Sequence, residues 1–178
     1  MKYLHSNEIE RRATELLKSV KAMDIPVRVD AVAHRLGLRV ECTPLGEEVS
    51  GLLIIENGRG TIGINEAQPL VRQRFTLAHE IGHYVLHRDQ SELFIDKKYT
   101  AVFRDSRSSS GEHRAEIQSN RFAAALLMPR PLLESEIDAR EFDLGDESAL
   151  EKLAADFVVS TQAMAFRLSN LGIFNILR

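Results

Sequence analysis

The chain has little of what secreted and membrane proteins need. It contains a single cysteine, Cys42, among 178 residues, which excludes an internal disulfide framework and fits a reducing compartment. No stretch approaches the roughly 20 apolar residues that a membrane span requires. Residues 1–6 lack the apolar segment of a signal peptide, so we expect a cytoplasmic protein without a membrane partner.

Neither sign of charge is in large excess, with 23 basic and 26 acidic residues. The net charge of -3 provides no general attraction to nucleic acids or to acidic membranes. The hydrophobic content of 44% is enough for a folded core, so a wholly disordered chain is excluded. The length suits one domain, or one domain with a small appendage, and no internal repeat is present.

The most informative stretch is residues 79–83, which read His-Glu-Ile-Gly-His. Residues four apart lie on the same face of a helix, so His79 and His83 can direct two imidazoles at one metal ion. Glu80 is then close enough to reach a metal-bound water. A helix is predicted because apolar residues recur at helical intervals on the side away from the histidines, at Leu77, Ala78, Ile81 and Val85.

Other residues near this motif have less certain roles. His87 continues the histidine face but lies two turns from His79, too far for the same metal, so we expect a supporting or surface position. Gly82 costs about 1 kcal/mol relative to alanine inside a helix, which predicts a close neighbour. The small residues Ala123–Ala125 would allow another helix to approach there. Arg72 and Arg74 are expected on a solvated face, with the binding of a carboxylate as the alternative.

A second segment, residues 112–128, reads as a helix that can supply a third ligand. A catalytic zinc usually has three protein ligands and an open position for water. Glu116 is the preferred candidate, and Glu112 and His113 compete for this role. Asn120 lies one helical turn after Glu116 and can hydrogen-bond a ligating histidine.

The first half of the chain predicts two helices and a small sheet. Residues 7–22 form an amphipathic helix, with Asn7 and Glu10 spaced as in a capping box. Residues 31–36 form a short helix that Asp30 can cap. Three strands are then expected: residues 38–42, with Cys42 as a buried apolar residue, and the two arms of a hairpin within residues 51–65 that turns at Asn57-Gly58.

The remaining segments are a polar loop and a helical appendage. Residues 104–111 are rich in turn formers, and they form either a lid over the site or a solvated connection. Residues 148–170 read as two helices that resemble a helix-turn-helix. Residues 131–178 contain four basic and nine acidic residues, and the second helix carries only Arg167. Because DNA affinity depends on basic contacts to phosphate, we expect packing or partner recognition rather than direct nucleic-acid binding.

Two segments together resemble the ImmA/IrrE family of bacterial and phage metallopeptidases. Residues 74–83 read Arg-Phe-Thr-Leu-Ala-His-Glu-Ile-Gly-His, and residues 116–129 read Glu-Ile-Gln-Ser-Asn-Arg-Phe-Ala-Ala-Ala-Leu-Leu-Met-Pro. The resemblance extends over about residues 31–174. Ser119 stands where the family often has alanine, a change between small residues. The metzincin pattern is excluded, since Leu86 and Asp89 occupy its glycine and histidine positions.

The resemblance implies an α+β fold with a zincin-like core over residues 1–130. In this fold a small, mostly antiparallel sheet packs on helices, and the helix-turn-helix-like residues 131–178 pack on the core as part of one compact unit. The resemblance implies a zinc ion bound by three side chains, His79, His83 and Glu116. It also implies that Glu80 is the catalytic residue.

The resemblance also implies a substrate class. Members of the family cleave helix-turn-helix repressors and thereby derepress prophage, mobile-element or stress-response genes. Two other functions remain open at this stage: a non-cleaving regulatory or toxin–antitoxin-type partner of a repressor, and a DNA-binding regulator. No residue stands out as the group that stabilises the oxyanion, and the candidates are Tyr84, Tyr99 and His113.

Overall fold

The computed structural model describes residues 4–97, 110–139 and 147–173, and over these ranges it has seven helices and a four-stranded sheet. The helices are α1 (Ser6–Ser19), α2 (Val29–Arg35), α3 (Leu70–His87), α4 (Ser110–Leu127), α5 (Arg130–Ala139), α6 (Glu147–Phe157) and α7 (Thr161–Asn170). The strands are β1 (Arg39–Thr43), β2 (Val49–Glu56), β3 (Arg59–Asn65) and β4 (Leu93–Lys97). The predicted α+β class is therefore confirmed.

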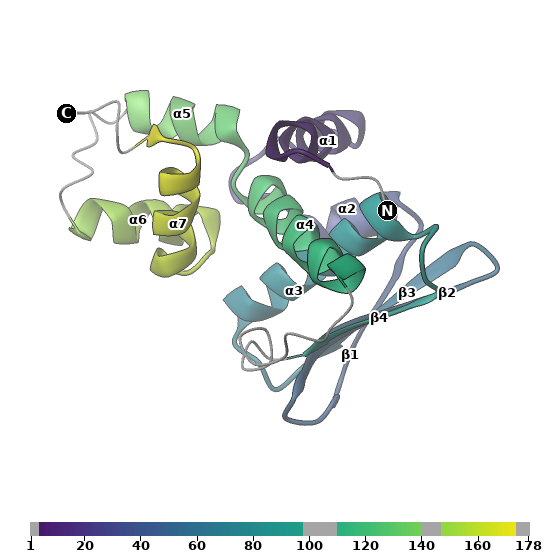
Figure 1. Cartoon of the computed structure of the whole chain (residues 1–178). Helices are drawn as coiled ribbons and strands as arrows, with labels where there is room; N and C mark the ends of the chain where they lie inside the picture. The colour runs from purple at the N-terminus through teal and green to yellow at the C-terminus, as the bar shows by residue number, and fades with distance from the viewer. Residues whose placement is uncertain (1–3, 98–109, 140–146, 174–178) are drawn as a thin grey trace.

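The elements are stacked outward from the sheet. α3 packs against β2 and β3, α4 packs against α3, and α1 packs against α4. Helices α5, α6 and α7 gather at the end of the molecule that is remote from the strands (Figure 1). The described helices include none with the length and apolar character of a membrane span.

The sheet has the order β1-β3-β2-β4. β2 pairs antiparallel with both β3 and β4, while β1 pairs parallel with β3, so the sheet is mixed and mostly antiparallel. The predicted hairpin is present, with positive φ angles at Asn57 (50°) and Gly58 (76°), as a tight two-residue turn requires. The fourth strand, β4, was not predicted.

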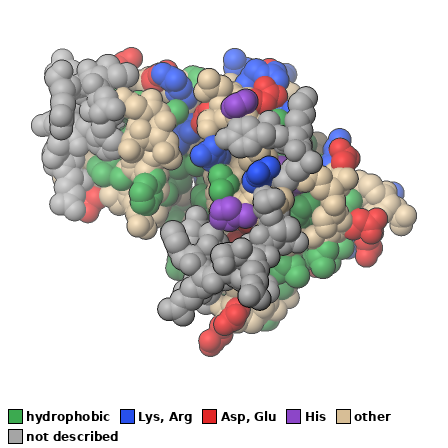
Figure 2. All heavy atoms as spheres, viewed as in Figure 1, with side chains coloured by type: hydrophobic (Ala, Val, Ile, Leu, Met, Phe, Trp, Pro, Cys, Tyr) green, Lys and Arg blue, Asp and Glu red, His purple; other side chains and the backbone are tan. Residues whose placement is uncertain are grey.

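Alternation along the strands separates an inner face from an outer one. Leu53 and Ile62 are fully buried on the inner face beneath α3. On the outer face Ile54, Leu93 and Ile95 are 37%, 51% and 45% exposed. Hydrophobic side chains are visible along the strands in the space-filling view (Figure 2).

The prediction of a buried Cys42 is wrong. The side chain is exposed, and so are all the residues of β1 before Thr43. The cause lies in the topology: β1 is an edge strand that pairs with β3, and α3 packs over β2 and β3 instead. The predicted strand is therefore present, but α3 does not cover it, and its residues from Arg39 to Cys42 are exposed.

The middle of helix α3 is buried on all sides rather than amphipathic, because the sheet covers one face and α4 covers the other. Every residue from Thr76 to Tyr84 is buried. The predicted close approach at Gly82 is confirmed, since a Cβ added there would lie 3.1 Å from Cα of Ser119 and 3.2 Å from its carbonyl oxygen. The neighbour is thus the backbone of Ser119, and not the predicted Ala123–Ala125.

The helix starts near the N-terminus differ from the prediction. His5 is the N-cap of α1, and no side chain caps this helix, so the proposed capping box of Asn7 and Glu10 is wrong. The Glu10 carboxylate binds elsewhere, as described below. Asp30 lies in the first turn of α2 instead of capping it.

The C-terminal helices follow the predicted pattern of two helices and a tight turn. Val158 has a positive φ of 53° between α6 and α7, and the Ser160 hydroxyl accepts a hydrogen bond of 3.1 Å from the Ala163 amide. Helix α5 was not predicted. Of the predicted loop at residues 104–111, residues 104–109 lie outside the described residues, and Ser110 and Gly111 belong to α4.

Candidate metal centre

Three donor groups meet between α3 and α4. The Nε2 atoms of His79 and His83 are 3.0 Å apart, and the Glu116 carboxylate oxygens lie 3.3 Å from the first nitrogen and 3.2 Å from the second. In a tetrahedral zinc site with metal–ligand distances near 2.1 Å, neighbouring ligand atoms are about 3.4 Å apart. The spacing of the three donors therefore fits one metal ion.

Both helices are needed to assemble this group. The two histidines lie one turn apart on α3, and both are 1% exposed. Glu116 comes from α4, one turn before Ser119, whose backbone contacts Gly82. Because glycine has no Cβ, α4 can approach α3 at Gly82, and Glu116 comes within reach of the two imidazoles.

The protonation states of the donors depend on one another. Burial lowers the pKa of His79, but contact with the Glu116 carboxylate and the charge of Glu80 outweigh it and raise this pKa to about 9. Burial raises the pKa of Glu116, and the two histidines lower it by more, well below its usual range. Burial lowers the pKa of His83. Because metals bind deprotonated donors, a metal must displace a proton from His79.

Glu80 is fully buried, and neither of its carboxylate oxygens has a hydrogen-bond partner among the described residues. Burial is the main reason that its pKa rises to about 8. A Cβ at Gly51 would lie 3.2 Å from Oε1 of Glu80 and 2.3 Å from Cγ2 of Thr76, so only glycine leaves room for this arrangement. An unpaired, buried carboxylate beside three metal donors fits a base that acts on a water molecule.

Asn120 orients the first histidine. Its Oδ1 lies 3.0 Å from Nδ1 of His79. Since an amide oxygen can only accept, the Nδ1–H group donates, and Nε2 is left facing the other donors. The hydrogen bond between Asn120 and His79 is the one expected for a residue one helical turn after Glu116.

The other residues considered from the sequence are placed differently. His113 is exposed and lies outside the donor group, and the side chain of Glu112 is not among those described. Tyr84 is buried near Gly60, and Tyr99 lies outside the described residues. Arg74 is not on a solvated face: its guanidinium donates to the carbonyl oxygens of Val27 and Val158, at 2.9 and 3.3 Å.

Arg72 is half-buried and lies close to the sheet. Its guanidinium donates to the Ser50 hydroxyl at 3.4 Å and lies 5.9 Å from the centre of the Phe75 ring. The expected solvated face is therefore wrong for both arginines, because β2 and the loops around α3 cover it.

Asp96 was missed in the sequence. It is half-buried on β4, and one of its carboxylate oxygens lies within 4.8 Å of a ring nitrogen of His79 and of a carboxylate oxygen of Glu80. Phe94, two residues before Asp96 on β4, stacks on the His83 ring, and the two ring centroids are 4.6 Å apart. The signal was the short apolar run Leu93-Phe94-Ile95, which fits a strand, and residues two apart on a strand, such as Phe94 and Asp96, share one face.

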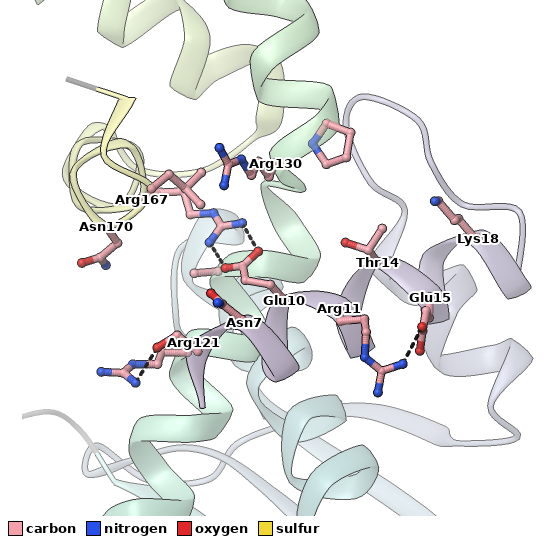
Figure 3. A pocket seen from close by; sticks show the side chains of 14 residues that line it. Asn7, Glu10, Arg11, Thr14, Glu15, Lys18, Arg121, Arg130, Arg167 and Asn170 are labelled. Carbon is pink, nitrogen blue, oxygen red and sulfur yellow. Dashed lines mark hydrogen bonds and ion pairs between the residues drawn. The ribbon is translucent and has the colours of Figure 1, made fainter. Parts of the chain in front are cut away.

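A separate hollow of about 730 Å³ lies between α1, α4, α5 and α7 (Figure 3). It contains none of the metal donors. Arg167 points across it at Glu10, as the labelled side chains show, and donates to both carboxylate oxygens. Arg121 donates to the Ser6 hydroxyl at 2.9 Å, so Arg121 and Arg167 are both engaged within the protein.

The segments that carry the donors match a known protein family. The peptidase M78 family model, described as IrrE N-terminal-like domain, matches residues 33–169, which include all three donors and Glu80. The chain belongs to this family. The family is one of peptidases, and the His-His-Glu group is a possible metal site. This family assignment agrees with the resemblance of the two sequence motifs.

Among solved structures, a Mycobacterium tuberculosis transcriptional regulator has a similar fold, with a TM-score of 0.55 and 17% sequence identity. The match covers 94% of this chain and 48% of that chain, so this chain spans about half the length of the regulator. At this identity the likeness concerns the fold alone. No curated protein matches the chain.

Proposed function

We propose that this family member is a zinc-dependent endopeptidase that cleaves a helix-turn-helix transcriptional repressor. The observation that carries the proposal is the triangle of His79, His83 and Glu116 with the unpaired carboxylate of Glu80 beside it. Two imidazoles and one carboxylate with an open position are a donor set of catalytic zinc. Zinc would supply Lewis acidity towards the scissile carbonyl and make water acidic enough to act near neutral pH.

The side chains of Glu80 and Asn120 would then carry out proton transfer and hold the first histidine in position. Glu80 accepts a proton from the attacking water and passes it to the leaving amine. Neither of its carboxylate oxygens has a hydrogen-bond partner among the described residues, so both can accept a proton. Asn120 holds the imidazole of His79 in position throughout.

The sheet offers a place for an extended substrate. β4 is an edge strand, and among the described residues it pairs with β2 alone. Phe94 and Asp96 face the donors from this strand. A peptide that adds to the free edge of β4 would have its backbone held by hydrogen bonds close to Glu80.

The substrate class rests on the family. Repressor cleavage is what the ImmA/IrrE resemblance implies, and the similar fold of a transcriptional regulator is compatible with a role in gene control. We infer that the cleaved repressor releases prophage, mobile-element or stress-response genes. The same reasoning makes a repressor the partner in the non-cleaving alternative.

The decisive experiment compares wild type with Glu80→Gln in repressor cleavage, each loaded with zinc. We expect cleavage by wild type, loss of at least about 1,000-fold with Glu80→Gln, and unchanged zinc content, because the amide cannot accept the proton. Glu151→Gln, an exposed position on α6, is the matched control and should cleave normally. Equal cleavage by Glu80→Gln and wild type would refute the role of Glu80.

The same experiment separates the other functions. A repressor that is inactivated equally by wild type and Glu80→Gln, without any cut, would favour a non-cleaving partner. Direct DNA binding has little support, because Arg167 is 4% exposed and donates to Glu10 and to the Met128 carbonyl oxygen. On the face seen in Figure 2, basic and acidic side chains are intermixed rather than gathered into a basic patch.

A further inference from the structure

The two histidines of the metal centre are held in different ways. In His79 the Nδ1–H group donates to Oδ1 of Asn120 at 3.0 Å, which orients the ring. In His83 the Nδ1 atom is buried and has no hydrogen-bond partner among the described residues. No hydrogen bond from the described part of the chain therefore fixes the direction in which the His83 ring points.

The Phe94 ring lies flat against the His83 ring. The ring centroids are 4.6 Å apart, and the angle between the ring planes is 27°. Aromatic pairs at this separation attract each other by more than the burial of their surface. The χ2 angle of a histidine is otherwise only loosely restricted. A turn of the imidazole about χ2 would drive its edge into the Phe94 ring, so the stack restricts this rotation.

Strand β4 brings Phe94 to this place. In the pairing of β2 with β4, Phe94 lies opposite Leu53, which is fully buried beneath α3. Phe94 is half-buried on the same inner face. The next residue, Ile95, belongs to the outer face and is 45% exposed. β4 thus contributes an aromatic side chain to the metal centre although it supplies none of the three donors.

We propose that Phe94 is a positioning residue, which holds the imidazole of His83 in the direction that metal binding requires. The proposal rests on the proposed metal centre of His79, His83 and Glu116. Phe94 does by stacking for His83 what Asn120 does by a hydrogen bond for His79. Nε2 of His83 is then already 3.2 Å from the Glu116 carboxylate before a metal arrives, and such preorganised ligands bind more tightly.

The test measures metal binding by the full-length protein, with Co²⁺ as a coloured substitute for zinc. Competition with a chelator gives the affinity, and visible absorption reports the geometry around the ion. Phe94→Leu should weaken Co²⁺ binding about tenfold or more and change the spectrum, because it removes the group that orients a ligand. Phe94→Tyr keeps the aromatic ring and should restore the affinity to within about threefold of wild type.

Ile95→Ala is the matched control, because it changes the neighbouring residue on the outer face of the same strand. It should bind Co²⁺ as wild type does. Unchanged affinity and spectrum in Phe94→Leu would overturn the proposal. An equal loss in Phe94→Leu and Phe94→Tyr would show that the ring is not what matters. An equal loss in Phe94→Leu and Ile95→Ala would assign the effect to β4 as a whole and would overturn the proposal as well.

A measurement on wild type covers the case in which Phe94→Leu does not fold. In the zinc-loaded protein we expect nuclear Overhauser contacts between the ring protons of Phe94 and His83, and upfield shifts of the His83 ring protons. The absence of both would contradict the proposed stack. The metal centre itself is tested separately by His83→Ala: if this variant binds Co²⁺ as tightly as wild type, the three-donor centre fails.

Discussion

His87 shows how burial changes the chemistry of one residue. The side chain is 2% exposed, so of the two expected positions, supporting or surface, the surface position is wrong. Its Nδ1 accepts a hydrogen bond of 3.1 Å from the Gln90 amide group, and its ring lies 5.9 Å from that of His83. Burial, with a further contribution from His83, lowers its pKa to about 4. His87 is therefore neutral in the folded protein at pH 7.

This lowered pKa predicts a loss of stability in acid. As the pH falls below 6.5, the unfolded chain protonates His87 while the folded chain does so only near pH 4. The unfolded state thus gains protons first, and up to about 2 kcal/mol of the free energy of unfolding is lost between pH 7 and 4.5. His87→Gln should remove this part of the loss, as measured by urea unfolding of the chelator-treated protein.

A matched variant makes the pH effect specific. His34→Gln changes an exposed histidine on α2 and should keep the acid sensitivity of wild type. If His87→Gln loses as much stability as wild type over the same pH range, the buried neutral histidine is not the cause.

At the scale of elements, the contact between α3 and α4 is the most consequential. It brings together the two helices that carry the donors, and Gly82 lies close to the backbone of Ser119 in this contact. A glycine inside a helix is unfavourable by itself, so its presence reflects the space that the neighbouring backbone takes.

Gly82→Ala should therefore weaken the metal site. The added Cβ would lie 3.1 Å from Cα of Ser119, and a backbone atom cannot move aside as a flexible side chain can. We expect a net destabilisation of about 1–2 kcal/mol, because overpacking exceeds the gain in helix propensity. Zinc affinity should fall about tenfold or more, because α4 carries Glu116 away from the histidines.

Isothermal titration with zinc and thermal unfolding measure the two effects of Gly82→Ala. Ser135→Ala, which is exposed on α5, is the control for a helical substitution without a packing conflict. Unchanged zinc affinity in Gly82→Ala would show that the donors do not depend on this close approach.

At the scale of the whole molecule, Arg167 connects the C-terminal helices to the first helix. Its guanidinium donates to both oxygens of Glu10 and, at 3.0 Å, to the carbonyl oxygen of Met128 at the end of α4. The basic residue of the second helix-turn-helix-like helix is thus used inside the protein. We propose that residues 1–130 and 131–178 form one folding unit held partly by this contact.

Removing the guanidinium should destabilise the whole protein. Arg167→Met would leave the Glu10 carboxylate and the Met128 carbonyl oxygen without their partner, which should cost about 2–4 kcal/mol. Arg167→Met/Glu10→Gln should recover part of this loss, since no charge is then left unpaired. Denaturant unfolding followed by circular dichroism should show one transition in wild type, whereas two separate transitions would contradict a single folding unit.

The sequence alone was enough to predict the features that depend on residues close together in the chain. The four-residue spacing of His79 and His83 places both on one helix face, whatever the rest of the chain does. The Asn57-Gly58 pair determined the hairpin turn because both residues tolerate positive φ. Glu116 and Asn120 could be predicted as helical neighbours of each other, and the need of a catalytic zinc for a third protein ligand predicted that this face meets the two histidines.

Only the tertiary structure decided what depends on residues far apart in the chain. Cys42 is exposed because its strand lies at the sheet edge, and no periodicity in residues 38–42 reveals the strand order. Asp96 reaches the metal centre because an unpredicted strand pairs with β2. Glu10 and Arg167 are 157 positions apart, and their ion pair exists because α1 and α7 line the same hollow.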